Sequence, residues 1–323
     1  MSPEAIKEKL IIYSGLNAYR RHRNRKPRVL FWHGIDSRVD RALYPENFSV
    51  EVFKKQIRYL RRHYDIVSIK EFDHRLATGS FSGREMLLTF DDGYANNLYV
   101  VEPILSQYNL PFTVFISTDN ITTGDFYPTT VNRMVTRAAG LERLVLPSLG
   151  REFSMPTDAD RAAVCSTVGK LLKSSPLDEV KGIVDDLINN LTADQRAAMK
   201  RRYECVRPMN WEEVARLSRK ENVTIGSHGM WHIICHERQD PEVVKHQLAG
   251  SKQLIEERLQ LPCDYFAYPN GDNTALSNDC VKTLYRMGFG ADQKTEVCQT
   301  SSHVLPRILA YLDVNVFKRL INT

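Results

Sequence analysis

The sequence predicts an α/β fold, because short apolar segments typical of buried strands alternate along the chain with segments of helical periodicity. Polar residues follow two of these predicted strands directly, as Asp91-Asp92-Gly93 and as the segment that begins at Ser227. The chain has 323 residues, 42% of them hydrophobic, which suits a single elaborated domain with a sizeable core. Alternation alone permits either a barrel or an open sheet.

The first half of the predicted domain consists mainly of strands and the helices that connect them. The helix over 50–63 rests on the helical spacing of Val52, Phe53, Ile57 and Leu60. We expect strands at 29–32, 65–69, 86–90 and 112–117, and a further helix at 94–108.

Residues 124–208 show no strand pattern, and three stretches within them look helical, at 161–172, 177–189 and 193–203. We therefore expect a helical insertion, which either walls the substrate cleft or is a stabilising appendage. Beyond it, Asn210 and Glu213 form a capping-box pattern that opens a helix through Lys220. The remaining expected elements are the strand beginning at Val223, helices at 241–258 and 278–287, and strands at 265–268, near 289 and near 305.

The segment Leu87–Phe90 reads as a buried strand that stops at two adjacent carboxylates, Asp91 and Asp92. At the end of a strand, two such side chains can diverge, one toward a metal ion and one toward a water molecule. An Asx turn followed by glycine is the alternative interpretation.

A second candidate cluster consists of His228 and His232, which stand at positions i and i+4. On a helical turn this spacing places both rings on one face, and neutral imidazole is a common ligand of zinc. Two histidines and one aspartate leave a coordination position open, as catalytic zinc sites do. In an alternative assignment His236 continues the series, but the polar residues after it indicate a surface position.

Taken together, the motifs Thr89-Phe90-Asp91-Asp92-Gly93 and Ser227-His228-x-x-x-His232 resemble those of polysaccharide deacetylases of the NodB-homology type, carbohydrate esterase family 4. Residues 29–35, 266–271 and 305–308 are similar to further segments of that family. The resemblance implies a distorted (β/α)7 barrel. It also implies a hydrolase that removes N-acetyl groups from an amino sugar in a polysaccharide, oligosaccharide or lipid-linked glycan.

The resemblance also assigns roles. It implies that Asp92, His228 and His232 bind a divalent metal, with zinc favoured and cobalt or nickel as alternatives. Asp91 would act as general base toward the attacking water. The backbone N–H of Asn270 would belong to the oxyanion hole.

The chain departs from the family pattern in two places. Residues 264–269 lack the arginine that orients the base in many members, so we expect Arg307 to pair with Asp91; an ordinary surface ion pair is the alternative. The terminal Leu-x-His motif, which supplies the general acid in many members, is also missing. His303 and His33 are the candidate acids, unless protonated Asp91 itself passes its proton to the leaving amine.

These departures keep two other functions open. One is a non-catalytic, glycan-binding member of the family. The other is a hydrolase of a different bond, such as a cyclic amide or an O-acetyl ester.

Basic residues are concentrated near the N-terminus. The net charge is +5, and Arg20, Arg21, Arg23, Arg25, Lys26 and Arg28 supply six positive charges without an intervening acid. This distribution argues against a nucleic-acid-binding protein. We expect residues 1–28 to form a basic arm with an apolar helical stripe, which touches anionic lipid headgroups or a phosphorylated glycan carrier, or else is a solvated tail. Residues 29–323 would form the catalytic domain.

The sequence shows neither a secretory hydrophobic region nor a run of about 18 apolar residues. We therefore expect a cytoplasmic protein, peripheral to the inner face of the membrane if the arm binds there. The six cysteines lack Cys-x-x-Cys spacing, which predicts free thiols.

Overall fold

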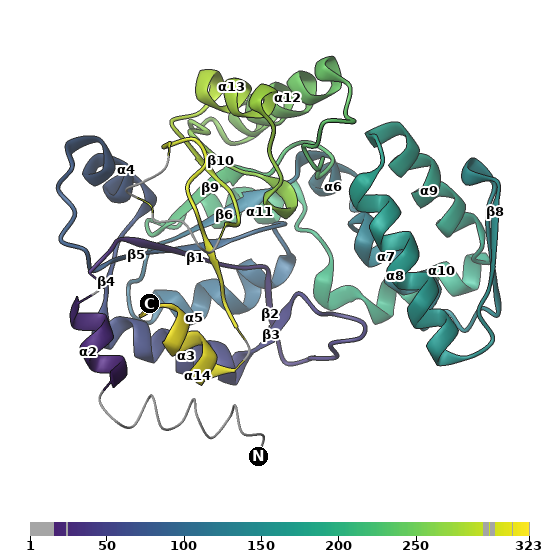
Figure 1. Cartoon of the computed structure of the whole chain (residues 1–323), viewed down its shortest axis with the longest axis horizontal. Helices are drawn as coiled ribbons and strands as arrows, with labels where there is room; N and C mark the ends of the chain where they lie inside the picture. The colour runs from purple at the N-terminus through teal and green to yellow at the C-terminus, as the bar shows by residue number, and fades with distance from the viewer. Residues whose placement is uncertain (1–15, 24, 293–296, 298–300, 312, 323) are drawn as a thin grey trace.

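The computed structural model describes residues 16–23, 25–292, 297, 301–311 and 313–322. A body built on one parallel sheet carries a lobe on one side, formed by α7–α10 and the β7–β8 hairpin (Figure 1). Within the described residues, no helix combines the length and apolar character that a membrane span needs. Most of the predicted N-terminal helix lies outside the described residues, as does Cys298, and the five described cysteines are free thiols.

The main sheet has the strand order β11-β10-β9-β6-β5-β1-β12, with β4 paired to β5, and each pairing in it is parallel. A bridge between Phe289 and Leu305 connects the two ends of this order, so the sheet curls into a distorted (β/α) barrel, as expected. The strands span Arg28–Trp32 (β1), Asp65–Ile66 (β4), Glu85–Phe90 (β5), Phe112–Ile116 (β6), Val223–Ser227 (β9), Tyr265–Ala267 (β10), Met287–Phe289 (β11) and Ile308–Leu309 (β12). A separate pair is formed by β2 (Gly34–Asp36) and β3 (Asn47–Ser49).

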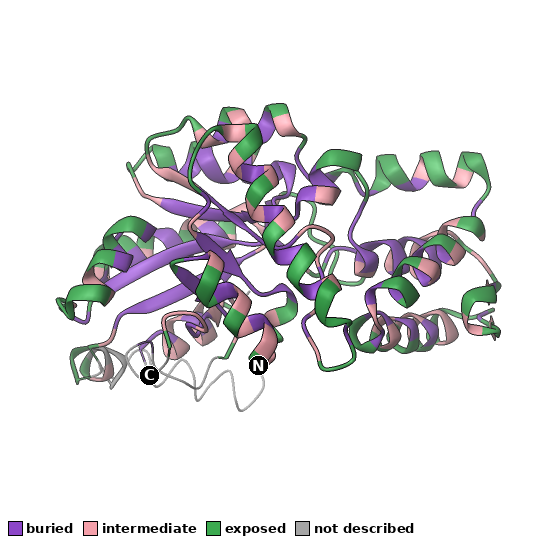
Figure 2. Cartoon of the chain, turned by 90° about the horizontal axis from the view of Figure 1, so that it is seen from above, coloured by how far each residue is buried: buried purple, intermediate pink, exposed green. Residues whose placement is uncertain are grey.

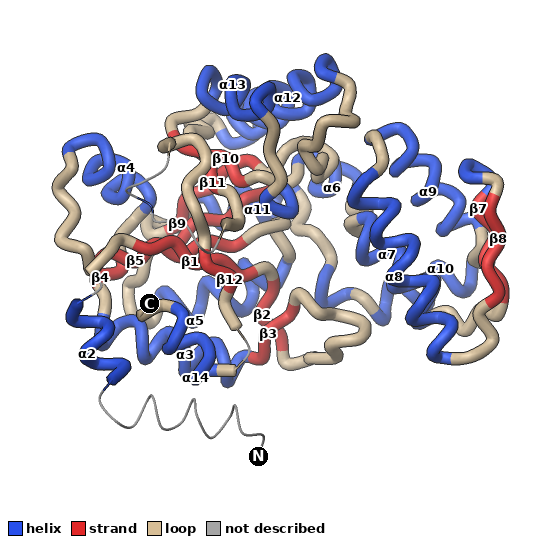
Figure 3. Tube along the Cα trace, viewed as in Figure 1, coloured by secondary structure: helices blue, strands red, loops and turns tan. Residues whose placement is uncertain are grey.

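Helices surround this sheet (Figure 3). The α-helices span Leu16–Arg23 (α2), Val50–His63 (α3), Ile69–Thr78 (α4), Glu102–Ser106 (α5), Thr118–Thr123 (α6), Pro128–Arg133 (α7), Asp158–Ser174 (α8), Leu177–Asn189 (α9), Ala193–Arg202 (α10), Trp211–Ser218 (α11), Pro241–Leu259 (α12), Ala275–Leu284 (α13) and Val314–Leu320 (α14). Shorter helical turns are η1 (Asn97–Val101), η2 (Met134–Ala138), η3 (Pro147–Leu149), η4 (Glu204–Val206) and η5 (Pro269–Gly271).

Several predicted elements agree closely with the structure. Helices α3 and α9 have the predicted bounds, because a regular apolar stripe fixes both. The capping box of α11 is present, with the side chain of Asn210 accepting from the N–H of Glu213 and the Glu213 side chain accepting from the N–H of Asn210.

Two predictions were wrong. The strand expected at 65–69 ends at Ile66, because the Ser68 side chain caps α4, a helix that we did not predict. The prediction of no strand within 124–208 also fails, since β7 (Arg143–Leu146) and β8 (Arg151–Ser154) form an antiparallel hairpin. Each of these strands has only four residues, too short for alternation to stand out, and the hairpin is held by packing of Leu144 and Leu146 into the lobe.

Buried residues gather in two regions, the interior of the barrel and the interior of the lobe (Figure 2). Each residue of β1, β5 and β6 is buried, which explains their nearly continuous apolar sequences. The lobe has its own apolar cluster, to which α8 and α9 contribute Val168, Ile183 and Leu187. The lobe therefore has the packing needed to hold loops firmly beside the barrel.

Candidate metal centre

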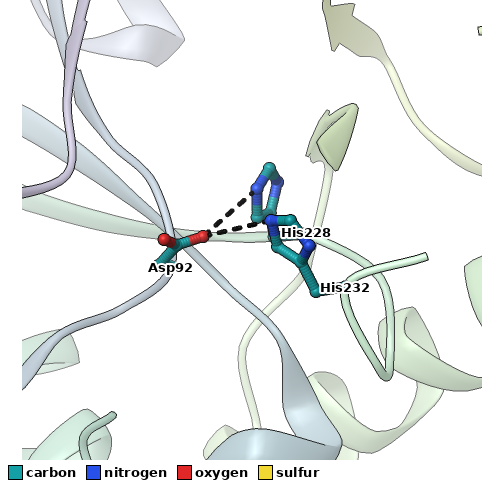
Figure 4. Close-up of side chains that lie close together, drawn as sticks. All are labelled: Asp92, His228 and His232. Atoms are coloured by element: carbon teal, nitrogen blue, oxygen red, sulfur yellow. Dashed lines mark ion pairs between the residues drawn. The ribbon is translucent and has the colours of Figure 1, made fainter. Parts of the chain in front are cut away.

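Asp92, His228 and His232 converge at the carboxyl ends of β5 and β9 (Figure 4). The Oδ1 atom of Asp92 lies 3.6 Å from Nε2 of His228 and 3.4 Å from Nε2 of His232. Each of the three residues would offer one atom to a metal, and these three atoms lie within 4.8 Å of one another. Two segments more than 130 residues apart thus meet around one point.

The backbone after β5 turns sharply to present Asp92. Asp92 has φ 70° and Gly93 has φ 63°, a left-handed conformation that costs a non-glycine residue about 1–3 kcal/mol. A Cβ atom at position 93 would lie 2.6 Å from Cγ2 of Ile116, so only glycine fits there. The hydroxyl of Tyr127, from the start of the lobe, donates to the backbone carbonyl of Asp92 and helps to hold this turn.

The two histidines do not lie on a helical turn, contrary to our expectation. His228 follows β9 directly, and His232 lies in an irregular loop where Gly229 has φ 78° and His232 itself has φ 51°. This loop folds back so that the ring centroids are 5.0 Å apart. The two predicted rings do lie together, while the conformation that joins them is set by a strained loop and not by a helical turn.

The surroundings of His228 fix the tautomer and the charge of its ring. Its Nδ1 atom lies 2.7 Å from the carbonyl oxygen of Ala267, which can only accept, so Nδ1 carries the proton and Nε2 is left free. Burial lowers the pKa of His228 to about 4, although the nearby Asp91 and Asp92 oppose this shift. The ring is thus neutral at pH 7, as a metal ligand must be.

Asp92 has one oxygen that the described residues leave unsatisfied. Its Oδ1 atom is buried without a hydrogen-bond partner, although it faces the two imidazoles. Burial raises the pKa of Asp92, but His232, His33 and His228 together lower it below its ordinary value. A buried carboxylate oxygen without a partner is costly. One carboxylate and two imidazoles fit a divalent cation such as zinc, which would satisfy this atom.

The neighbouring acid, Asp91, is held by Arg307. The two terminal guanidinium nitrogens lie 2.7 and 2.8 Å from its two carboxylate oxygens, and both side chains are buried. Nε of Arg307 donates to the carbonyl of Gly290 over 2.9 Å, and its guanidinium stacks 4.5 Å from the ring centroid of Phe31. Burial raises the pKa of Asp91, but the charge and hydrogen bonds of Arg307 outweigh burial and keep the pKa below its usual value.

The other predicted site residues lie in different places. Asn270 lines the cavity beside the metal centre and has φ 58°. His33 also lines this cavity, and its carbonyl accepts from Nδ2 of Asn97 over 2.9 Å. His303 does not line it; its ring pairs with Ser302 over 3.1 Å near the amino end of β11, where Gly288 N–H donates to the carbonyl of Ser302. His303 therefore lies at the opposite end of the sheet from the ligands.

His236 points away from the ligand set. Its Nε2 atom lies 3.1 Å from the carbonyl oxygen of Ser175 in the lobe, and the ring is only partly exposed. Within the described residues, the group able to hold a metal consists of Asp92, His228 and His232 without it.

The cavity next to the ligands has a volume of about 360 Å³, within the usual range for small-molecule sites. Barrel loops and the lobe both contribute to it. Its lining includes His33, Pro45, Glu46, Asp92, Pro128, Thr129, Arg133, Leu172, Lys173, Ser175, Leu177, Val180, Trp231, His232, Ile233, Ile234, Gln239 and Asn270.

A sequence model of the polysaccharide deacetylase family matches residues 78–142 and 189–289, together more than half of the chain. The chain belongs to the polysaccharide deacetylase family. The match includes the segments of Asp92 and of His228 and His232, and it omits residues 143–188 of the lobe.

Individual polysaccharide deacetylases and solved structures agree with this membership. A poly-beta-1,6-N-acetyl-D-glucosamine N-deacetylase of Staphylococcus epidermidis is 32% identical over 85 residues, which are 25% of this chain and 29% of that protein. The chain thus matches less than a third of that relative. The Streptococcus pyogenes deacetylase PplD, solved with acetate, is 16% identical with a TM-score of 0.56, covering 92% of this chain and 97% of its own. IcaB from Ammonifex degensii is 16% identical with a TM-score of 0.58, covering 91% and 97%. These likenesses show the shared fold.

Three features of this family member escaped the sequence analysis. Tyr127 supports the Asp92 turn, the carbonyl of Ala267 orients His228, and an ion pair between Glu46 and Arg133 lines the cavity. Tyr127 and Arg133 lie in the lobe segment that carries no recognisable motif. A backbone carbonyl such as that of Ala267 leaves no mark in the sequence.

Proposed function

We propose that this protein is a metal-dependent hydrolase that removes the N-acetyl group from an amino sugar of a glycan. One observation carries the proposal. An unsatisfied buried carboxylate oxygen faces two imidazole nitrogens, and a second carboxylate, fixed by an arginine, stands next to it in the chain. Family membership supports the choice of an N-acetylated polysaccharide as the substrate class.

In this proposal Asp92, His228 and His232 hold the metal. A divalent cation, for which zinc is our choice from the N,N,O donor set, supplies Lewis-acid polarisation of the acetamide and lowers the pKa of water. Each carboxylate oxygen of Asp91 uses one lone pair to accept a hydrogen bond from Arg307. The remaining lone pairs are free, and one of them accepts the proton of the attacking water. Arg307 is a positioning residue that fixes the orientation of this base.

Two further groups complete the proposed chemistry. The backbone N–H of Asn270, at the cavity wall, stabilises the developing oxyanion, a contribution typically worth about 2.7–4 kcal/mol of barrier. His33 rather than His303 protonates the leaving amine, because His33 lines the cavity with Asp92.

The intact ligand set and the Asp91–Arg307 pair favour catalysis over the alternative of a glycan-binding protein without activity. Arg307 takes the role left open by the arginine that residues 264–269 lack. We retain two proposals from the charge pattern: contact of the basic N-terminal arm with anionic headgroups, and a cytoplasmic location at the inner face of the membrane.

The decisive test is acetate release from N-acetylglucosamine oligomers by zinc-loaded protein. We expect turnover by the wild type, and a loss of at least about 100-fold for Asp91→Asn with metal content unchanged. Asn keeps the shape of Asp and one acceptor for Arg307. Because the substitution leaves the buried guanidinium without its counter-charge, a melting curve must show that the variant is folded at the assay temperature. Absence of acetate from every N-acetylated glycan, glycolipid and nucleotide sugar tested would refute the proposal. Full activity of Asp91→Asn would remove Asp91 from the role of base.

A further inference from the structure

The lobe segment that the family match omits forms part of the wall of the catalytic cavity. Residues 143–188 include the end of α8 and the start of α9, and they contribute Leu172, Lys173, Ser175, Leu177 and Val180 to the lining. The part of the chain that the family model does not match is thus placed where it can select the substrate.

Hydrogen bonds attach the α8–α9 turn to barrel loops. Nζ of Lys173 donates to Oδ1 of Asn270 over 2.8 Å, and the backbone N–H of Leu177 donates to Oε1 of Gln239 over 3.0 Å. The ring of His236 meets the carbonyl of Ser175 over 3.1 Å. Gln239 and Ser175 are buried, so the Leu177–Gln239 contact is packed, whereas Lys173 and Asn270 are exposed and their hydrogen bond lies at the surface.

A second junction connects the lobe to the barrel through Arg133 and Glu46. Arg133, at the end of α7, pairs with Oε1 of Glu46, and the two side chains are only 13% and 16% exposed. Nε of Arg133 also donates to the carbonyl of Leu43 over 3.2 Å. Within the described residues, the other oxygen of Glu46 is buried without a hydrogen-bond partner, so the ion pair lies inside this junction and not on the surface.

The strand order places these junctions on either side of the metal ligands. Asn270 follows β10. Glu46 lies near the end of β1, because its backbone carbonyl accepts a hydrogen bond from the N–H of Gly34, just beyond that strand. Between β10 and β1 the sheet contains β9, β6 and β5. Of these strands, β9 leads to His228 and β5 leads to Asp92. On each side of the cavity, therefore, a lobe residue contacts a barrel loop: Lys173 contacts Asn270 on one side, and Arg133 pairs with Glu46 on the other.

We propose that this cavity accepts the terminal N-acetylated sugar of a glycan chain and excludes sugars inside the chain. An inner residue needs two exits, one for the chain on each side. On one flank the α8–α9 turn contacts the barrel loops at buried Gln239 and at exposed Asn270, and on the other flank Arg133 pairs with Glu46, so lobe residues stand where the chain of an inner sugar would pass. The inference rests on the proposed deacetylase function. It assigns the substrate selection to residues of the lobe.

The product pattern tests this directly, because deacetylation leaves the sugar in the chain. A terminal-specific enzyme releases at most one acetate per unbranched oligomer, whatever the chain length. We expect this stoichiometry for zinc-loaded wild type on N-acetylglucosamine tetramers and hexamers labelled at the reducing end. Fragmentation mass spectrometry should find the free amine at one terminal unit.

Acetate from inner units, or a yield that rises with chain length, would overturn this inference while leaving the deacetylase function in place. Absence of acetate from every oligomer, including the disaccharide, would overturn the function and the inference with it. The two failures are therefore distinguishable in one experiment.

A variant locates the barrier. Glu46→Ala combined with Arg133→Ala removes both partners, so no buried charge is left unpaired. We expect acetate per chain to rise above one, with free amines at inner units. As a control, Lys170→Ala changes an exposed residue of the lobe helix α8 that does not line the cavity, and this variant should keep the wild-type pattern. An unchanged pattern in the double variant, with a melting curve that shows it folded, would overturn the assignment of this junction as the barrier.

Discussion

The guanidinium of Arg307 binds both carboxylate oxygens of Asp91, across 216 residues of sequence and inside the protein. Arg307 also contacts Thr89 Oγ1 at 3.3 Å, and that hydroxyl donates to the carbonyl of Leu30 over 2.8 Å. Asp91 is thus tied to β1, β5 and the segment before β12. Such a planar, two-bonded pair fixes the direction in which the remaining lone pairs of Asp91 point.

Replacement of Arg307 by methionine should lower the free energy of unfolding by about 3–5 kcal/mol, because it leaves the Asp91 carboxylate buried and unpaired. The double variant Arg307→Met/Asp91→Asn should recover much of this loss. Urea unfolding of the four proteins in the cycle measures the coupling. As a control, Arg143→Met breaks an exposed ion pair with Glu152 and should cost less than about 1 kcal/mol. Equal losses for Arg307→Met and Arg143→Met would contradict the importance of the buried pair.

Substitution of a proposed ligand should abolish stoichiometric metal binding. In Asp92→Ala and His228→Ala we expect zinc content to fall to less than about a tenth of that in the wild type after dialysis, because each change removes one of three ligands. Elemental analysis measures the content directly. His236→Ala serves as the matched control, since its ring meets Ser175 and lies outside the ligand set. Loss of metal in the control alone would reverse the assignment in favour of His236.

Metal binding should also stabilise the fold. A ligand present at about 100 times its dissociation constant adds about 2.7 kcal/mol to the free energy of unfolding. Zinc should therefore raise the melting temperature of the wild type, and a chelator should reverse the increase. The melting temperature of Asp92→Ala should respond to neither addition, because the variant lacks the carboxylate ligand. A similar zinc-dependent increase in both proteins would indicate binding elsewhere.

Glu213 should make stability depend on acidic pH. Burial raises the pKa of Glu213, but Arg207, the N–H of Asn210 and Tyr99 lower it from 4.5 to about 2. A carboxylate with a lowered pKa stabilises the fold above pH 4.5, and this stability is lost as the pH falls toward 2. Glu213→Gln should therefore cost about 1–3 kcal/mol at pH 7, and the difference from the wild type should shrink between pH 4.5 and 2. Unfolding curves across this range measure it, and a difference independent of pH would contradict the ionic origin.

Local sequence chemistry was sufficient to predict much of this protein. The apolar stripe of α3, the capping box of α11 and the buried strand before Asp91 each depend on residues a few positions apart, so their pattern is visible in the chain. The spacing of His228 and His232 likewise indicated two rings that lie together, and the motifs together indicated the family.

Only the tertiary structure decided how these pieces meet. The order of parallel strands brings Asp92 to His228, and the loop at His232 takes a left-handed backbone conformation that propensity disfavours. Two lobe residues that line the cavity, Arg133 and Lys173, bind partners 87 and 97 positions away. Such contacts are selected by packing of the whole chain, because no local rule relates residues so far apart in sequence.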